Sequence, residues 1–181
     1  MIISREKRKT NIAEYILYMW QVEDTIRAFK FDMDRLDREL IGKYEQPEEI
    51  KKEIREWYEN IASHMKNENV ESAGHVQFLK NIVLELYDYH LFLLKQPGES
   101  SYQELFTSLL PLIREMNALQ KWTAENEIET CLNAVYIYMM MRLKKREVSN
   151  GTRQALNHFI KFLALLSSKF RSYEEGKGVE S

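Results

Sequence analysis

Residues 128–143, with the sequence IETCLNAVYIYMMMRL, constrain the fold more than any other part of the chain. At 3.6 residues per turn, a helix formed by this stretch carries apolar side chains on two opposite sides. They are Ile128, Leu132, Val135, Met139 and Leu143 on one side, and Ala134, Ile137, Met140 and Met141 on the other. A helix that is apolar almost all round is usually buried on most of its sides. We therefore expect this helix at the centre of a helical bundle and as the least exposed element.

The composition favours a helical protein that neither spans a membrane nor binds nucleic acid. Glycine (6) and proline (3) are scarce in the 181 residues, whereas β-sandwiches need many turn residues. A net charge of −2 gives no general attraction to nucleic acid or to an anionic membrane. The longest uncharged stretch, residues 130–141, is too short to span a bilayer. The single cysteine, Cys131, is interpreted as a small buried side chain in a reducing compartment, so we expect a cytoplasmic protein.

Apolar residues spaced three and four apart predict helices along the rest of the chain. The expected helices lie at about residues 4–29, 34–41, 47–66, 72–95, 99–122, 125–143 and 150–173. Long helices joined by short turns pack antiparallel to their neighbours. The predicted fold class is therefore all-α, a single antiparallel bundle of about six long helices plus a short one. It forms one domain, residues 1–173, followed by a frayed tail, residues 174–181.

Several residues are expected to mark the helix boundaries. Gly42 should end the short helix, because glycine favours the left-handed turn past a helix end. Pro47 can open the next helix, where its missing N–H is not needed, and Trp57 should lie on the inward face of that helix. Thr152 or Asn150 is expected to cap the last helix.

The segment NIAEYILYMWQVEDTIRAF, residues 11–29, follows a basic start that contains Lys7 and Arg8. It resembles the opening of an uncharacterised family of all-helical Bacteroidetes proteins, a domain of unknown function. The resemblance implies a bacterial cytoplasmic protein with an all-α fold. It implies no activity, cofactor or catalytic residue.

Metal and cofactor sites are not expected. Di-iron and di-manganese bundles need glutamate on two helices and Glu-x-x-His on two more. The residues three positions before the four histidines are Ile61, Ser72, Tyr87 and Ala155, and none is a glutamate. We therefore expect no metal and no cofactor, and we assign no catalytic residue from a motif.

A basic run, residues 142–146 (RLKKR), follows the central helix. Such a run suggests phosphate binding, but cations at a helix C-terminus also complement the helix dipole, and their stems cover apolar surface. We prefer the second interpretation because no glycine loop accompanies the run. Nucleic acid is not an expected partner, since the chain carries no recognisable binding motif.

Four ionisable side chains fall within otherwise apolar helical arcs, namely Glu23, Arg27, His90 and Arg142. The structural interpretation is a Glu23–Arg27 ion pair, a buried His90, and an Arg142 that reaches water from a helix end. The functional interpretation is one polar pocket with Trp20 and Tyr138 in its wall. There the two arginines would receive a small anionic ligand, and Glu23 or His90 would handle a proton.

Two classes of function remain open. The first is a non-catalytic helical interaction or scaffold protein that binds another protein or itself. The second is a ligand-binding or enzymatic bundle that uses the polar pocket. We favour the first class, because active sites usually leave a cleft of perturbed titratable groups and the sequence shows only one weak cluster of this kind. Leu91 and Phe92 project away from the inward seam of their helix, which predicts a homodimer.

Overall fold

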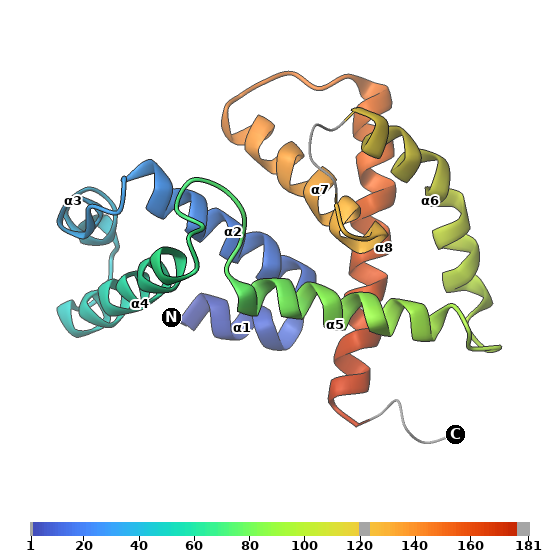
Figure 1. Ribbon diagram of the computed structural model, residues 1–181, viewed down its shortest axis with the longest axis horizontal. Helices are drawn as coiled ribbons and strands as arrows, with labels where there is room; N and C mark the ends of the chain where they lie inside the picture. Colours follow the sequence, from blue (N-terminus) through green and yellow to red (C-terminus); the bar gives the residue numbers. More distant parts are fainter. Residues whose placement is uncertain (1, 120–123, 177–181) are drawn as a thin grey trace. The chain divides into compact units, whose positions relative to one another are not determined.

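The structure, a computed structural model, describes residues 2–119 and 124–176 (Figure 1). All regular structure in these residues is helical, with no strand, so the predicted all-α class is confirmed. The elements are α1 (Ile2–Thr10), α2 (Ile12–Ala28), α3 (Met33–Glu39), η1 (Ile41–Lys43, a 3-10 helix), α4 (Glu48–Asn67), α5 (Gln77–Leu93), α6 (Ser100–Leu119), α7 (Glu127–Leu143) and α8 (Asn150–Glu174). The expected end of a helix at residue 122 and the last five residues of the predicted tail lie outside the described residues.

The chain divides into two compact units. The first comprises residues 1–9 and 14–82, and within it α3, η1 and α4 contact one another. The second comprises residues 10–13 and 83–181, and within it α6, α7 and α8 all contact one another. The expectation of one domain over residues 1–173 stays a prediction.

The first predicted helix is two helices, because Asn11 interrupts it between α1 and α2. Asn11 fits this position, since its short polar side chain favours a helix N-terminus over a helix interior. The helix that was expected to open at Pro47 is α4, which begins one residue later, at Glu48, with Pro47 as its N-cap. Its buried aromatic residue is Tyr58, whereas Trp57 is only half-buried, so the inward face is rotated from the predicted one.

Gly42 does not end the short helix in a left-handed turn, and that prediction was wrong. The glycine lies inside η1, and its φ is not positive. The buried side chains of Leu36 and Ile41 flank this turn, and the Leu40 backbone N–H donates to the Leu36 carbonyl. The chain therefore continues as a tighter helical turn, in which a Cβ at residue 42 would lie 3.3 Å from the Asp37 carbonyl oxygen.

Only the first half of α7 is buried as predicted. Ile128, Leu132 and Val135 lie in the core of the second unit, where α6 and α8 cover them. Residues 136–141 are half-buried, and Leu143, expected in the core stripe, is 63% exposed. The prediction that α7 would be the least exposed helix was wrong, because buried residues recur along the whole length of α2 but only along half of α7.

The ends of two further helices differ from the sequence prediction. The N-cap of α8 is Ser149, whose hydroxyl accepts a hydrogen bond from the Thr152 N–H at 3.1 Å, and neither Thr152 nor Asn150 takes that role. Helix α5 begins at Gln77, five residues later than expected. The preceding residues include Gly74 at φ +86°, a left-handed conformation that ends regular helix.

Candidate functional site

A hollow of about 700 Å³ lies in the second unit, where the chain passes from α7 to α8. Figure 1 shows this connection as a long arch between the two helices. The hollow is lined mainly by cationic side chains from the end of α7, the connection and the first turn of α8. The lining residues are Tyr138, Arg142, Lys145, Arg146, Glu147, Val148 and Arg153. We call this hollow the basic pocket.

Both ends of the connection are fixed by backbone geometry. At the end of α7, the Lys145 N–H donates to the Arg142 carbonyl at 3.0 Å, and the Arg146 N–H donates to the Met141 carbonyl at 2.9 Å. These two bonds form a Schellman motif, which places Lys145 in the left-handed position usually filled by glycine, at φ 53°. At the other end, Ser149 caps α8. The local sequence therefore sets where the cations of the pocket stand.

The cations of the basic pocket have no ion-pair partner among the residues that the structure describes. Arg142, Lys145, Arg146 and Arg153 form no ion pair with any residue that the structure describes, and Glu147 is the only acidic lining residue. The Arg142 guanidinium lies 5.9 Å from the centre of the Tyr138 ring, a cation–π contact that leaves its N–H groups available to donate hydrogen bonds to a ligand. The pocket therefore presents a concentrated positive potential to solvent.

Arg55 of the first unit has a different environment. Arg55 contacts three carboxylates, at 2.6 Å to Asp34, 3.1 Å to Asp37 and 2.9 Å to Glu59. These contacts raise the pKa of the Arg55 guanidinium. Arg55 is therefore neutralised by three acidic neighbours, whereas the four cations of the basic pocket form no ion pair with a described residue.

Glu23, the first of the predicted site residues, is fully buried in the first unit. Its carboxylate accepts hydrogen bonds from His75 Nδ1 at 2.5 Å and from the Val76 backbone N–H at 2.9 Å. The His75 ring stacks on Trp20 with 4.3 Å between centroids. The sequence interpretation missed this contact, because it placed His75 in the first turn of a helix expected from about residue 72, whereas the structure leaves His75 in the segment before α5.

Arg27 does not pair with Glu23, so the predicted partner was wrong. Its ion pair is with Asp24, at 2.8 Å, one turn earlier on α2. It also donates hydrogen bonds to the backbone carbonyls of Val70, at 3.0 Å, and of Gly74. Arg27 and Glu23 therefore both hold the segment that follows α4.

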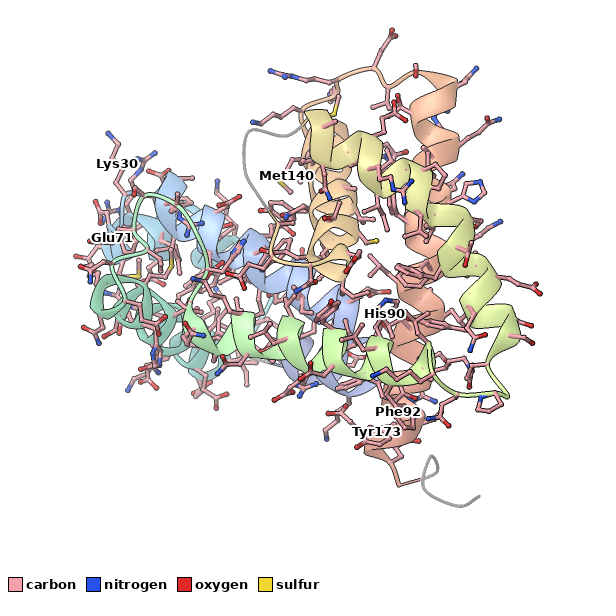
Figure 2. The ribbon with its side chains drawn as sticks, turned by 45° about the vertical axis from the view of Figure 1, so that its right-hand side comes forward. Lys30, Glu71, His90, Phe92, Met140 and Tyr173 are labelled. Atoms are coloured by element: carbon pink, nitrogen blue, oxygen red, sulfur yellow. The ribbon has the colours of Figure 1, made fainter. Side chains whose placement is uncertain are left out.

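His90 is buried in the second unit, with 1% of its surface exposed (Figure 2). Its Nδ1 lies 2.6 Å from the Tyr102 hydroxyl, and its ring contacts Phe106 and Phe162 edge to face. Burial among these neutral groups lowers the His90 pKa to about 4. His90 is therefore neutral at pH 7 and is not among the lining residues of the basic pocket.

The structure thus groups the six predicted site residues in three environments. Tyr138 and Arg142 are together in the basic pocket of the second unit, whereas His90 lies in the aromatic core of the same unit. Glu23, Arg27 and Trp20 belong to the first unit. Convergence of all six on one pocket stays a prediction.

The remaining candidate chemistry is weak. No group of three or more His, Cys, Asp or Glu side chains in the described residues is arranged to hold a metal ion. Burial raises the pKa of the Cys131 thiol, which keeps it protonated and unreactive. Within the part of the chain that the structure describes, no helix is both long and apolar enough to cross a membrane.

Fold and site together define an all-α protein whose last two helices frame a cationic hollow. The chain belongs to the DUF4924 family, described as a domain of unknown function, which it matches over residues 1–177. The resemblance noted for residues 11–29 to an uncharacterised family is thereby confirmed. Comparisons with curated proteins and with solved structures give no match.

Proposed function

We propose that this protein is a non-catalytic binding protein whose second unit receives an anionic ligand in the basic pocket. The observation that supports this proposal is the set of four cations around a hollow of about 700 Å³ without an ion pair to any described residue. That volume lies within the range of small-molecule sites. Of the predicted site residues, Arg142 keeps its proposed role as an anion receptor, and Tyr138 lies beside it in the wall.

The helix dipoles explain the positions of only some of these cations. Arg142 and Lys145 stand at the C-terminus of α7, where cations are favourable. Arg153 stands in the first turn of α8, where a cation is unfavourable, and that turn contains no acidic residue. An anion bound in the pocket would compensate both Arg153 and the N-terminus of α8. A ligand explains this arrangement better than a helix-end effect does.

Binding is favoured over catalysis by the chemistry of the lining. Arginine and lysine stay protonated near neutral pH, and of the described lining residues only Glu147 is a carboxylate. The lining includes neither histidine nor cysteine. These groups hold and orient an anion, but they offer no matched pair of proton donor and acceptor.

Titration with inorganic pyrophosphate tests the proposal. Calorimetry or NMR should show saturable binding that weakens with added salt, since the cations are exposed. Arg142→Gln and Arg153→Gln should each weaken binding about tenfold, the loss of roughly 1.4 kcal/mol from one charge-assisted hydrogen bond. Arg114→Gln is the matched control, because Arg114 is an exposed arginine of α6 outside the pocket.

Two results would contradict this function. One is the absence of pyrophosphate binding at millimolar concentration. The other is binding that Arg114→Gln weakens as much as the two pocket variants do. An RNA or DNA oligonucleotide that binds far more tightly than pyrophosphate, with a steep salt dependence, would identify the pocket as a nucleic-acid site instead.

Self-association is a second proposed function, carried by an exposed aromatic cluster. Phe92 and Tyr173 are 46% and 44% exposed, and Figure 2 shows them close together. Both rings contact Tyr89, at centroid distances of 6.0 Å and 5.0 Å. Leu91, which was also expected to project outward, is half-buried. We propose that Tyr89, Phe92 and Tyr173 form the contact of a homodimer.

We also propose a bacterial cytoplasmic location. The support is the single, fully buried cysteine, which suits a reducing compartment, together with the origin that the family resemblance implies. Fractionation of the native cells, with an antibody to this chain, tests the location. Recovery in a membrane or secreted fraction would contradict it.

A further inference from the structure

A second hollow, about 350 Å³ in volume, lies beside the basic pocket in the same unit. Its lining is mainly apolar and comes from α6, α7 and α8. Its large apolar lining residues are Leu112, Met116, Ile137, Met141, Leu156 and Phe159. We call it the apolar pocket. The hollow is partly open to solvent, and its volume is that of about ten water molecules at roughly 30 Å³ each.

The two pockets share a wall. Tyr138 lines both, and neighbouring residues on each side of the turn divide between them. On α7, Met141 faces the apolar pocket and Arg142 the basic one, and on α8 the pair is Thr152 and Arg153. A ligand that reaches from one pocket into the other therefore passes Tyr138.

The apolar pocket also explains the unexpected exposure of α7. The second half of this helix is as apolar as the first, yet its residues 136–141 are only half-buried. Ile137 and Met141 are two of these residues, and both line the apolar pocket. Apolar side chains in this position are stabilised by an apolar group that displaces water from them.

We infer that the ligand is a single-chain amphiphile with a phosphate-like anionic head in the basic pocket and an unbranched apolar chain in the apolar pocket. This inference rests on the proposed anion-binding function. Charge complementarity fixes the head, and the adjoining apolar lining fixes the position of the chain. The shared Tyr138 supplies a boundary with an apolar ring and a polar hydroxyl.

The probes are inorganic phosphate and the butyl, hexyl and octyl phosphates, titrated by calorimetry into the full chain below their micelle concentrations. Each methylene that enters the pocket should strengthen binding roughly two- to fourfold. Octyl phosphate should therefore bind at least a hundredfold more tightly than inorganic phosphate. Arg142→Gln should weaken all four probes by a similar factor.

Variants that fill the apolar pocket test the position of the chain. Ala155→Phe adds a ring at a lining residue of α8, and Gln154→Phe adds the same ring at the adjacent exposed position. Ala155→Phe should abolish the dependence on chain length and leave inorganic phosphate binding unchanged, whereas Gln154→Phe should alter neither. Gly151→Leu is a second filling variant, since the nearest atom to a Cβ there, Ser149 Oγ, lies 4.0 Å away.

The outcomes separate this inference from the proposed function. Equal affinity for inorganic and octyl phosphate overturns the inference and leaves the anion site standing. A chain-length dependence that survives both filling variants overturns the inference as well. If none of the probes binds, or if octanol binds as tightly as octyl phosphate, the proposed anion-binding function is refuted, and this inference is refuted with it. Anionic phospholipid vesicles that bind equally to the wild type and to Ala155→Phe would assign the basic pocket to a membrane surface and overturn the inference.

Discussion

Lowering the pH from 7 to 5 is expected to destabilise the protein through His90. The imidazole is buried among Tyr102, Phe106 and Phe162, and its pKa in the folded chain is about 4, against an ordinary value of 6.5. In the unfolded chain His90 takes up a proton below pH 6.5, whereas in the folded chain it stays neutral until about pH 4. The neutral, buried imidazole therefore favours folding above pH 6.5, and this contribution declines as the pH falls from 6.5 towards 4.

The size of the effect follows from the two pKa values. At pH 5, the free energy of unfolding should be lower than at pH 7 by about 2 kcal/mol on account of His90 alone. Near pH 4 the loss should approach roughly 3 kcal/mol. These are large fractions of the stability of an ordinary domain, so the acid limb of the stability curve should be steep.

Urea denaturation at pH 7, 6 and 5 measures this effect when the wild type is compared with His90→Gln. The glutamine does not titrate and can still hydrogen-bond to the Tyr102 hydroxyl, which Nδ1 of His90 approaches to 2.6 Å. The variant should be less stable than the wild type at pH 7, and the difference should shrink by about 2 kcal/mol at pH 5. The matched control is His158→Gln, at an exposed position of α8. Parallel curves for wild type and His90→Gln across this range would refute the reasoning.

Three further predictions concern separate parts of the chain. Glu23→Gln should lower the free energy of unfolding by about 1–2 kcal/mol, because the charge-assisted hydrogen bond from His75 is lost while the Val76 N–H keeps an acceptor. An unchanged midpoint of urea denaturation would contradict this. Lys145→Gly should raise the free energy of unfolding by up to about 1 kcal/mol, because glycine adopts the left-handed conformation at φ 53° without strain. A clear loss of stability would contradict this and would show that the lysine side chain has a structural role. Phe92→Ser should convert a homodimer to a monomer by light scattering at micromolar concentration, and a monomeric wild type would end the dimer proposal.

The all-α fold and most of the helix positions were predictable because they depend on local periodicity. What periodicity leaves open is which face a neighbouring element covers. Residues 128–143 read as apolar on all sides, and only packing against α6 and α8 decides that Val135 is buried while Leu143 is not. The predicted end of the short helix was wrong for a similar reason, because the buried side chains of Leu36 and Ile41 lie on either side of a turn that continues through Gly42 as a 3-10 helix.

The candidate site was predictable in part. The basic run in the sequence includes Arg142, Lys145 and Arg146. Arg153 lies beyond the turn on another helix, and only the structure shows that it lines the same hollow. The partner of Glu23 was missed for the same physical reason. A carboxylate four residues before an arginine favours a pair on one helix, whereas His75 is separated from Glu23 by 52 positions.

The bond from the Val76 N–H to the Glu23 carboxylate gives the first unit a built-in reporter of local motion. Val76 precedes the first residue of α5, so its amide proton is shielded by a side chain of α2 and not by a helical hydrogen bond. Its hydrogen exchange should therefore follow the release of this one segment, whereas amides in the middle of α2 exchange only when that helix itself opens. In Glu23→Ala, Val76 should lose its protection first, and the difference from the α2 amides would measure how far the segment opens without the helix.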